Sequence, residues 1–217
     1  LRASARDNQT PLVFAGGPCV FNPEPLAPFM DFFVIGEGEE VIVEIAEALR
    51  ETKDKPREGK LEALARIEGV YVPSLYPFET LDDGRVVPSL DAEPIRKRLV
   101  GDLNQAKYPT KLVVPFTQQV HDRAGIEVLR GCTHGCRFCQ VGMTTRPVRE
   151  RDLETIDTLL EEIIDETGYE ETSLVSLSTC DYSRAQALVH QAAARAASAD
   201  MSVSLPSLRL DTFAVDL

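Results

Sequence analysis

Short apolar runs that end in glycine and precede amphipathic stretches recur along the chain, and this rhythm restricts the possible folds. In the N-terminal part the runs are PLVFAGGP, at residues 11–18, and DFFVIGEGEE, at residues 31–40. Because strands that alternate with helices pair in parallel through crossovers, the rhythm predicts an α/β fold with a parallel sheet. The second run is followed by an apolar stripe with helical spacing, formed by Val41, Ile42, Ile45, Ala46 and Leu49.

The same rhythm returns in the C-terminal part of the chain. Strands are expected at 125–131, at 173–179 and from residue 201. Helices are expected from Asp152 to Thr167, with Gly168 as the stop signal, and from Arg184 to Ala199. Three strands with two intervening helices form the first part of an α/β barrel, whose complete form takes about 250 residues. The faces expected to point inward are Leu153, Ile156, Leu159, Leu160, Ile163 and Ile164 in the first helix, and Ala185, Leu188, Val189, Ala192, Ala193 and Ala196 in the second.

A proline-rich stretch separates these two parts. The tetrapeptide Val-Pro-Ser-Leu occurs at 72–75 and at 87–90, and Asp82-Asp83-Gly84 lies between the copies as a turn signal. The prolines restrict such strands to edges, so we expect a β-hairpin in an exposed connector. The predicted organisation is therefore an α/β part at 1–52, a connector at 53–120, and the beginning of a barrel at 121–217.

Composition excludes several classes of function. Asp and Glu number 35 against 23 for Lys and Arg, which gives a net charge of −12 and argues against general nucleic-acid binding. No apolar run approaches the roughly 18 residues of a membrane span, and the start LRASARDNQT lacks the apolar centre of a signal peptide. We therefore expect a cytoplasmic protein. The missing initiator Met and the end at DTFAVDL, just after an expected strand, suggest a piece of a longer protein.

Three of the five cysteines lie in the segment RGCTHGCRFCQVG, as Cys132, Cys136 and Cys139. An odd cysteine count without an export signal argues against a disulfide scaffold, and clustered thiols in a reducing compartment favour a metal-binding or catalytic role. Thiolates suit zinc or iron–sulfur clusters, and each usually takes four protein ligands. His134 is a formal fourth ligand for zinc, but the short loop around it would be strained by a four-point wrap.

Several interpretations of this loop compete. Cys136-Arg-Phe-Cys139 alone resembles a redox dithiol, but this leaves Cys132 unexplained. A structural zinc or iron–sulfur site in a non-catalytic binding or scaffold protein is a second possibility, and a chance cluster of thiols is a third. The remaining interpretation is a [4Fe–4S] cluster with three thiolate corners and one open iron, which is comparable to the open position of catalytic metal sites.

The pattern Cys132-x3-Cys136-x2-Cys139, with Phe138 before the last cysteine and a strand before the first, resembles the radical S-adenosylmethionine (radical SAM) superfamily. The resemblance implies that S-adenosylmethionine chelates the open iron through its amino and carboxylate groups. An electron donor such as flavodoxin or ferredoxin would then supply the electron that cleaves it to methionine and a 5′-deoxyadenosyl radical. By the same resemblance, Phe138 and the backbone near Val141 and Gly142 lie along the adenine.

The expected second barrel strand departs from the family pattern. Many members carry Gly-Gly-Glu at its end to hold the amino group of S-adenosylmethionine, whereas this chain reads LSTCDYS at 177–183. The hydroxyls of Ser178 and Thr179 and the carboxylate of Asp181 are candidate acceptors for that ammonium group. On the third strand, Ser204, Ser207 and Arg209 are candidates for the carboxylate or the ribose, and the planar guanidinium of Arg209 suits a carboxylate.

The resemblance also reaches the N-terminal part. AGGP and DFFVIGEGEE are similar to the closing strands of a Rossmann-like, cobalamin-binding-like domain that precedes the radical SAM domain in one subfamily. Such domains commonly carry Asp-x-His-x-x-Gly, but no histidine precedes His121 here, so cobalamin is only a possible cofactor. The resemblance leaves methylthiolation, methyl transfer and rearrangement of an unknown substrate open. A partial barrel would also expose unpaired edges, through which it can associate with another chain.

The remaining candidates are interpreted as structural. We expect Cys19 and Cys180 to be small buried hydrophobic residues. The basic stretch at Arg146, Arg149 and Arg151 is interpreted as solvated side chains at the entrance of a helix rather than as an anion site. In the radical SAM interpretation His134 has no role.

Overall fold

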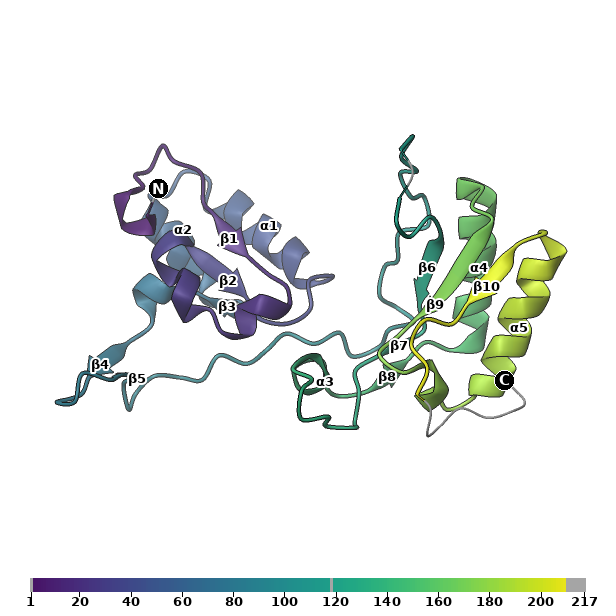
Figure 1. Cartoon of the computed structure of the whole chain (residues 1–217). Coiled ribbons are helices and arrows are strands. Elements are labelled where there is room, and N and C mark those ends of the chain that lie inside the picture. Colours follow the sequence, from purple (N-terminus) through teal and green to yellow (C-terminus); the bar gives the residue numbers. More distant parts are fainter. Residues whose placement is uncertain (1, 118, 210–217) are drawn as a thin grey trace. The chain divides into compact units, whose positions relative to one another are not determined.

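The computed structural model describes residues 2–117 and 119–209, and the chain forms two compact units, Leu1–Val100 and Gly101–Leu217 (Figure 1). Both units combine helices with a three-stranded sheet, and both sheets contain parallel strands, so the predicted α/β class with parallel pairing is confirmed. None of the helices in the described residues combines the length and the apolar character that crossing a membrane requires.

The sheet of the first unit has the order β1-β2-β3. Strands β1 and β2 are parallel, whereas β3 runs antiparallel to β2. The connection between β1 and β2 consists of 3-10 helices at Pro18–Phe21 and Glu24–Phe29 in place of an α-helix, because its prolines cannot sustain α-helical hydrogen bonding. The elements of this unit are β1 (Phe14–Ala15), β2 (Phe32–Val34), α1 (Val41–Glu51), α2 (Arg57–Leu64), β3 (Val70–Tyr71) and further 3-10 helices at Ala3–Ala5 and Pro73–Leu75.

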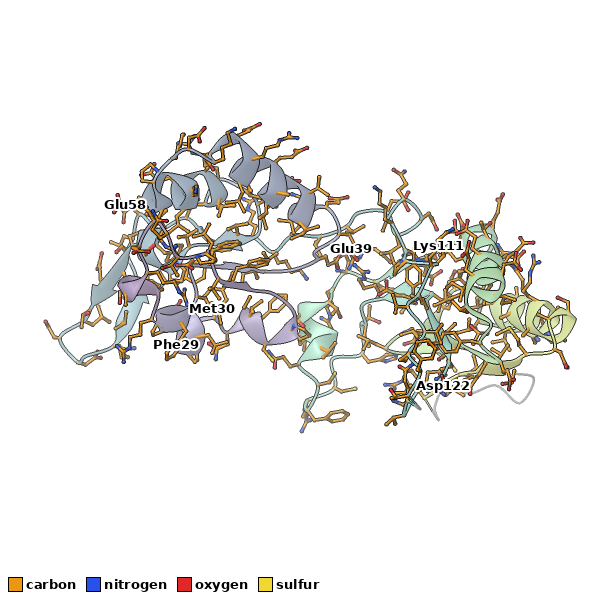
Figure 2. All side chains as sticks on the ribbon, turned by 90° about the horizontal axis from the view of Figure 1, so that it is seen from above. Phe29, Met30, Glu39, Glu58, Lys111 and Asp122 are labelled. Carbon is orange, nitrogen blue, oxygen red and sulfur yellow. The ribbon has the colours of Figure 1, made fainter. Side chains whose placement is uncertain are left out.

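Helices α1 and α2 build the main core of the first unit against the sheet. Val41 and Ile45 of α1 are buried, but Ile42 is 48% exposed and Ala46 is also exposed. The predicted stripe was therefore wrong at these two positions and correct at Leu49, and Ala48 also packs against the core. This main core consists of the buried residues Phe32, Val34, Val41, Ile45, Leu61, Leu64, Val70 and Val72. A second cluster joins Val20, Phe33 and Tyr71, with Met30 packed against it (Figure 2).

Residues 53–73, assigned from the sequence to the connector, therefore belong to the packing of the first unit through α2 and β3. The turn at 82–84 lies between two antiparallel strands, β4 (Phe78–Thr80) and β5 (Val86–Pro88), and Gly84 takes a positive φ of 81° there. The second Val-Pro-Ser-Leu contributes to β5, whereas the first runs into the 3-10 helix Pro73–Leu75. The three-part division of the chain stays a prediction.

A buried carboxylate ties the N-terminal segment of the first unit to its sheet and to α2. Asp31 is almost fully buried, and its Oδ2 accepts from the Arg6 guanidinium at 2.9 Å and from the backbone N–H of Val13 at 2.7 Å. The Arg57 guanidinium lies 2.6 Å from the same oxygen. Two cations and one amide thus compensate the desolvated charge, as a buried carboxylate requires.

Replacing Asp31 by Asn should therefore destabilise the first unit. The change leaves Arg6 and Arg57 without their shared anion, and loss of one partner in a buried ion pair costs about 3–5 kcal/mol. Urea denaturation of the chain measures the effect. Asp83→Asn is the matched control, because the Asp83–Arg85 pair is exposed and its loss should cost under about 1 kcal/mol. Equal midpoints for the two variants would contradict a structural role for Asp31.

The sheet of the second unit has the order β10-β9-β6, and all its strands are parallel. The predicted helices are present with shorter bounds. Asp152 caps the first by accepting from the backbone N–H of Thr155 at 2.7 Å, and Gly168 ends it in the left-handed conformation. The elements of this unit are β6 (Ala124–Glu127), β7 (Leu129–Arg130), α3 (Val141–Thr144), β8 (Arg149–Glu150), α4 (Leu153–Thr167), β9 (Glu171–Val175), α5 (Ala185–Ser198) and β10 (Ser202–Ser204).

Helices α4 and α5 lie side by side along this sheet (Figure 1), and the Arg195 guanidinium contacts the Asp157 carboxylate between them. The predicted inward faces largely hold, although Ala193 is exposed. The core contains Ala124, Ile126, Val128, Leu129, Ile156, Leu160, Ile163, Leu174, Tyr182, Leu188 and Ala192. Because β6, β9 and β10 are parallel, their carboxyl ends lead into neighbouring segments at one edge of the sheet.

Candidate functional site

The cysteine loop follows β6 and β7 and starts at a position that only glycine can occupy. Gly131 takes a φ of +94°, and a Cβ at this residue would lie 2.6 Å from the carbonyl oxygen of Pro147. The loop then carries Cys132, Cys136 and Cys139, all partly exposed thiols, and the N–H of Cys139 donates to the carbonyl of Cys136 at 3.0 Å. The chain therefore returns to the β7–β8 hairpin while its thiols stay accessible.

Gly142, in the short helix α3, faces the thiol of Cys139 and the Cβ of Cys132. Its N–H donates to Sγ of Cys139 at 3.4 Å. A Cβ at this glycine would be 3.7 Å from Sγ of Cys139 and 3.9 Å from Cβ of Cys132. The first and last cysteines therefore border the same space, and the absent side chain of Gly142 leaves that space open.

Arginines of the segment after α3 donate to backbone carbonyls, and Arg146 holds the cysteine loop in this way. Arg146 donates from Nε to the carbonyls of Cys132 and Gly142, both at 3.0 Å, and from Nη2 to Thr133 at 3.1 Å. Arg151 is only 1% exposed and donates to the carbonyls of Glu127 and Leu103. The interpretation of this basic stretch as solvated side chains was therefore wrong.

The segment after β9 is fixed to the same part of the chain. The Tyr182 hydroxyl donates to the carbonyl of Arg151 at 2.6 Å, and burial raises the pKa of Tyr182, which keeps the phenol a donor. Ser183 donates to the Glu150 carboxylate from its N–H at 2.7 Å and from its hydroxyl at 2.5 Å. Strand β8 and the residue after it thus position the segment that follows β9.

Two hydroxyls in this second segment differ in their surroundings. Thr179 is buried, and its Oγ1 shares a hydrogen bond of 2.9 Å with Oγ of Ser176. Ser178 is 1% exposed, and its Oγ has no hydrogen-bond partner among the described residues. A buried hydroxyl without a partner is costly, so Ser178 marks a place where a polar group of a ligand would be stabilised.

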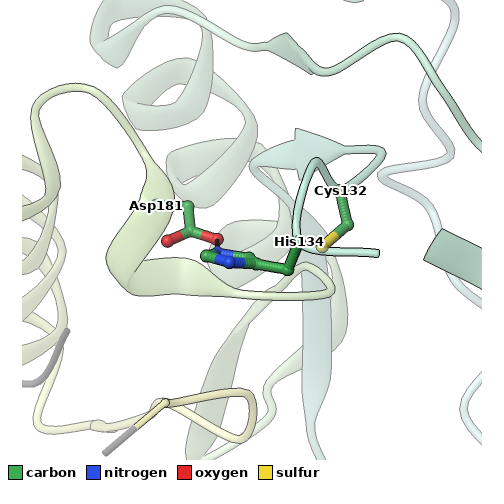
Figure 3. A group of neighbouring side chains, drawn as sticks. All are labelled: Cys132, His134 and Asp181. Atoms are coloured by element: carbon green, nitrogen blue, oxygen red, sulfur yellow. Dashed lines mark hydrogen bonds and ion pairs between the residues drawn. The ribbon is translucent and has the colours of Figure 1, made fainter. Parts of the chain in front are cut away.

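Figure 3 shows a contact that links the two segments directly. The Nε2 atom of His134 lies 2.6 Å from Oδ2 of Asp181, although the residues are 47 positions apart. The Cys132 thiol, a ring nitrogen of His134 and a carboxylate oxygen of Asp181 all lie within 4.8 Å of one another. The expectation that His134 has no role was therefore incomplete, because this side chain joins a cysteine to a candidate cofactor residue.

The third strand is shorter than expected: β10 ends at Ser204, so Ser207 and Arg209 lie in the segment that follows it. Arg209 directs Nη1 toward Sγ of Cys136 at 3.9 Å, and the Ser207 carbonyl accepts from the N–H of Thr179 at 2.9 Å. Ser204, in contrast, lies within β10, where its Oγ accepts from Arg123 at 3.3 Å. Since Arg123 precedes β6, this hydroxyl is directed away from the carboxyl ends of the strands.

The predicted site residues thus fall into groups. The structure brings the cysteines, Gly142, Asp181 and Arg209 to one edge, whereas the Phe138 side chain is 92% exposed. Cys19, expected to be buried, is exposed, and Cys180 is partly exposed. Sequence reasoning did not identify Arg146 and Glu150 as positioning residues. The sequence signal for them was the group of charged residues that follows the cysteines.

Comparison with known families agrees with this geometry. Residues 126–216 match the family described as the radical SAM superfamily, and residues 1–73 match the family described as radical SAM proteins, N-terminal. The chain belongs to the radical SAM superfamily. The match over the second unit covers the end of β6, the cysteine loop, and strands β9 and β10.

Similar proteins are much longer than this chain. The uncharacterized protein MJ0966 of Methanocaldococcus jannaschii is 27% identical over 82% of this chain and 34% of its own length. The anaerobic magnesium-protoporphyrin IX monomethyl ester cyclase of Cereibacter sphaeroides is 26% identical over 65% of this chain and 21% of its own length. The radical S-adenosylmethionine methyltransferase TsrM from Kitasatospora setae, solved with cobalamin and a [4Fe–4S] cluster, shares 14% identity and a TM-score of 0.49, over 89% of this chain and 41% of that chain.

The residues present fit a radical SAM cluster in their chemistry. Three thiols supply soft ligands, the position of Gly142 leaves space between two of them, and the N–H of Gly142 already faces a sulfur. The buried hydroxyl of Ser178 offers an acceptor that the described residues do not use. These features suit a thiolate-bound cluster together with a polar small molecule.

Filling the space at Gly142 should impair binding of a cluster. Gly142→Val places branched carbon atoms against Cys139 and Cys132, so we expect the iron content after anaerobic reconstitution to fall to less than about half of that of the unaltered chain. Met143→Val is the matched control, because it puts the same side chain at a half-exposed neighbouring position in α3. Equal iron contents in the two variants would mean that the space at Gly142 is not used.

Proposed function

We propose that this chain binds a [4Fe–4S] cluster through Cys132, Cys136 and Cys139 and that S-adenosylmethionine binds at the remaining iron. The observation that carries the proposal is the placement of three accessible thiols at the carboxyl edge of a parallel sheet, within the region that matches the superfamily. When bound, the reduced cluster supplies the electron that cleaves the carbon–sulfur bond to yield methionine and a 5′-deoxyadenosyl radical. A flavodoxin or ferredoxin in the cytoplasm is the proposed donor.

The chain's own residues would bind and orient the cofactor. Ser178 and Asp181 are the proposed acceptors for the ammonium group, since the first has an unused buried hydroxyl and the second lies close to Cys132. Thr179 supports this segment, because its hydroxyl is already bonded to Ser176. Arg209 is the proposed partner of the carboxylate, and its contact with Cys136 places a cation beside the cluster ligands.

The other predicted contacts are secondary parts of the proposal. Phe138 and the backbone at Val141 and Gly142 are proposed to lie along the adenine, and the exposed Phe138 ring would gain a partner there. Ser207 is proposed near the ribose. Ser204 has the weakest support, because its hydroxyl is bonded to Arg123 within the strand.

The partial barrel is also a proposal. The spatial order β6-β9-β10 follows the chain order, with α4 and α5 as crossovers, as in the first units of an α/β barrel. The first unit is proposed to be the end of a Rossmann-like domain, supported by its parallel β1–β2 pair. Its given sequence contains no Asp-x-His-x-x-Gly, and the proposal assigns no step to cobalamin, which stays a possible further cofactor.

A second candidate function is a structural metal site in a binding protein. The observation that favours it is the grouping of a thiol, an imidazole and a carboxylate from Cys132, His134 and Asp181, which are all ligands that zinc accepts. This candidate needs no reduced cluster and no S-adenosylmethionine. It also leaves Cys136 and Cys139 outside the metal site, and this difference separates the two functions.

Reconstitution with iron and sulfide under anaerobic conditions tests the proposal. We expect close to four iron atoms per chain, and an electron paramagnetic resonance signal of the reduced cluster that changes when S-adenosylmethionine is added. Cys136→Ala should abolish assembly, whereas Cys180→Ala, which alters a thiol outside the loop, should leave it intact. Two or fewer iron atoms together with one tightly bound zinc, retained in Cys136→Ala, would support the structural site instead.

A further inference from the structure

We propose that His134 is a positioning residue that holds the Asp181 carboxylate in place for the ammonium group of S-adenosylmethionine. This inference rests on the proposed function, because it assigns a role toward the cofactor that the cluster binds. Its new element is a histidine between the first two cysteines that acts through a residue 47 positions away. The carboxylate then contacts the cofactor, and the imidazole fixes the carboxylate.

The two segments that carry this pair are each anchored independently. Arg146 holds the cysteine loop through the carbonyls of Cys132 and Thr133. Glu150 and the carbonyl of Arg151 hold the other segment through Ser183 and Tyr182. The contact between His134 and Asp181 therefore is not needed to keep either segment folded. Its effect is on the carboxylate, whose orientation it determines.

The pair leaves a suitable acceptor free. His134 contacts Oδ2 of Asp181, so Oδ1 keeps its lone pairs for an incoming N–H donor. The N–H of Asp181 donates to the carbonyl of Ser178 at 3.1 Å, which puts both residues on one tight turn. The buried, unpartnered hydroxyl of Ser178 thus supplies a second acceptor on the same turn. An ammonium group with three N–H donors matches such a set.

The position of the pair also fits a cofactor held at the cluster. The Asp181 carboxylate and the Cys132 thiol are within 4.8 Å of each other, so a group bound by Asp181 lies next to a cluster ligand. An unrestrained aspartate side chain on a partly exposed turn samples several rotamers, and ordering it costs binding free energy. The imidazole removes this cost before the cofactor arrives.

The test compares two ligands of the reconstituted protein by equilibrium dialysis. S-adenosylmethionine carries the amino and carboxylate groups on a sulfonium centre, whereas 5′-methylthioadenosine keeps the adenosine with a neutral thioether sulfur and lacks both groups. We expect His134→Ala to weaken S-adenosylmethionine binding about tenfold, and Asp181→Asn to weaken it about thirtyfold, which are sizes typical of hydrogen bonds to charged groups. The affinity for 5′-methylthioadenosine should change by less than about twofold in both.

The double variant and the conservative variant separate positioning from a general structural effect. Because His134 acts through Asp181, the double variant should bind S-adenosylmethionine no more weakly than Asp181→Asn alone. His134→Gln retains an N–H donor and should recover part of the loss. His190→Ala, in the exposed part of α5, and Asp165→Asn, in the exposed part of α4, are the matched controls and should leave both affinities unchanged.

Other results overturn the inference. Equal weakening of both ligands, or additive losses in the double variant, would mean that His134 supports the loop and not the carboxylate. An iron content that falls in His134→Ala would assign His134 to the metal. Iron is measured on every sample, so a wild-type chain without about four iron atoms rejects the proposed function itself. If the wild-type chain holds about four iron atoms and His134→Ala leaves the affinity for S-adenosylmethionine unchanged, only the positioning role is rejected.

Discussion

The parallel pairing of β6, β9 and β10 is the constraint on which the site depends. Parallel strands place all their carboxyl ends at one edge, and each end here continues into a segment with chemically active side chains. The cysteine loop meets the turn around Asp181 across 47 residues of chain, and it meets Arg209 across 73 residues. The strand register brings these distant segments together. A slip of one residue in β9 would turn Asp181 and Ser178 toward other neighbours.

The arginines after α3 fix this arrangement by donating to backbone carbonyls of the loop and of its surroundings. The loop carries three partly exposed thiols, and its backbone carbonyls need hydrogen-bond donors. Arg146 bonds three of them, and Arg151, although almost fully buried, is compensated by two carbonyls and by the ring of Tyr108, 5.3 Å away. The planar, permanently charged guanidinium suits this task, because it offers several donors in fixed directions.

Local patterns predicted the parts of the fold that local forces determine. The 3.6-residue period, the Asp152 cap and the Gly168 stop identify α4, and the cysteine spacing identifies the loop. The pattern could not reveal that Arg151 is buried or that His134 meets Asp181, because both depend on which carbonyls and carboxylates lie nearby in space. At Ile42, helical periodicity allowed two adjacent stripes, and contacts with the sheet and α2 selected the one with residue 48.

The charges and donors around the thiols also affect how easily a bound cluster would be reduced. The chain carries a net charge of −12, and a cluster on three thiolates would add negative charge at the loop. Reduction of such a cluster becomes easier where donors and cations face its sulfur atoms. The N–H of Gly142 faces Cys139, and the guanidinium of Arg209 faces Cys136, so donors from two different strand ends converge on the ligands. In the proposed holoprotein, the fold that gathers the ligands therefore also favours acceptance of the electron.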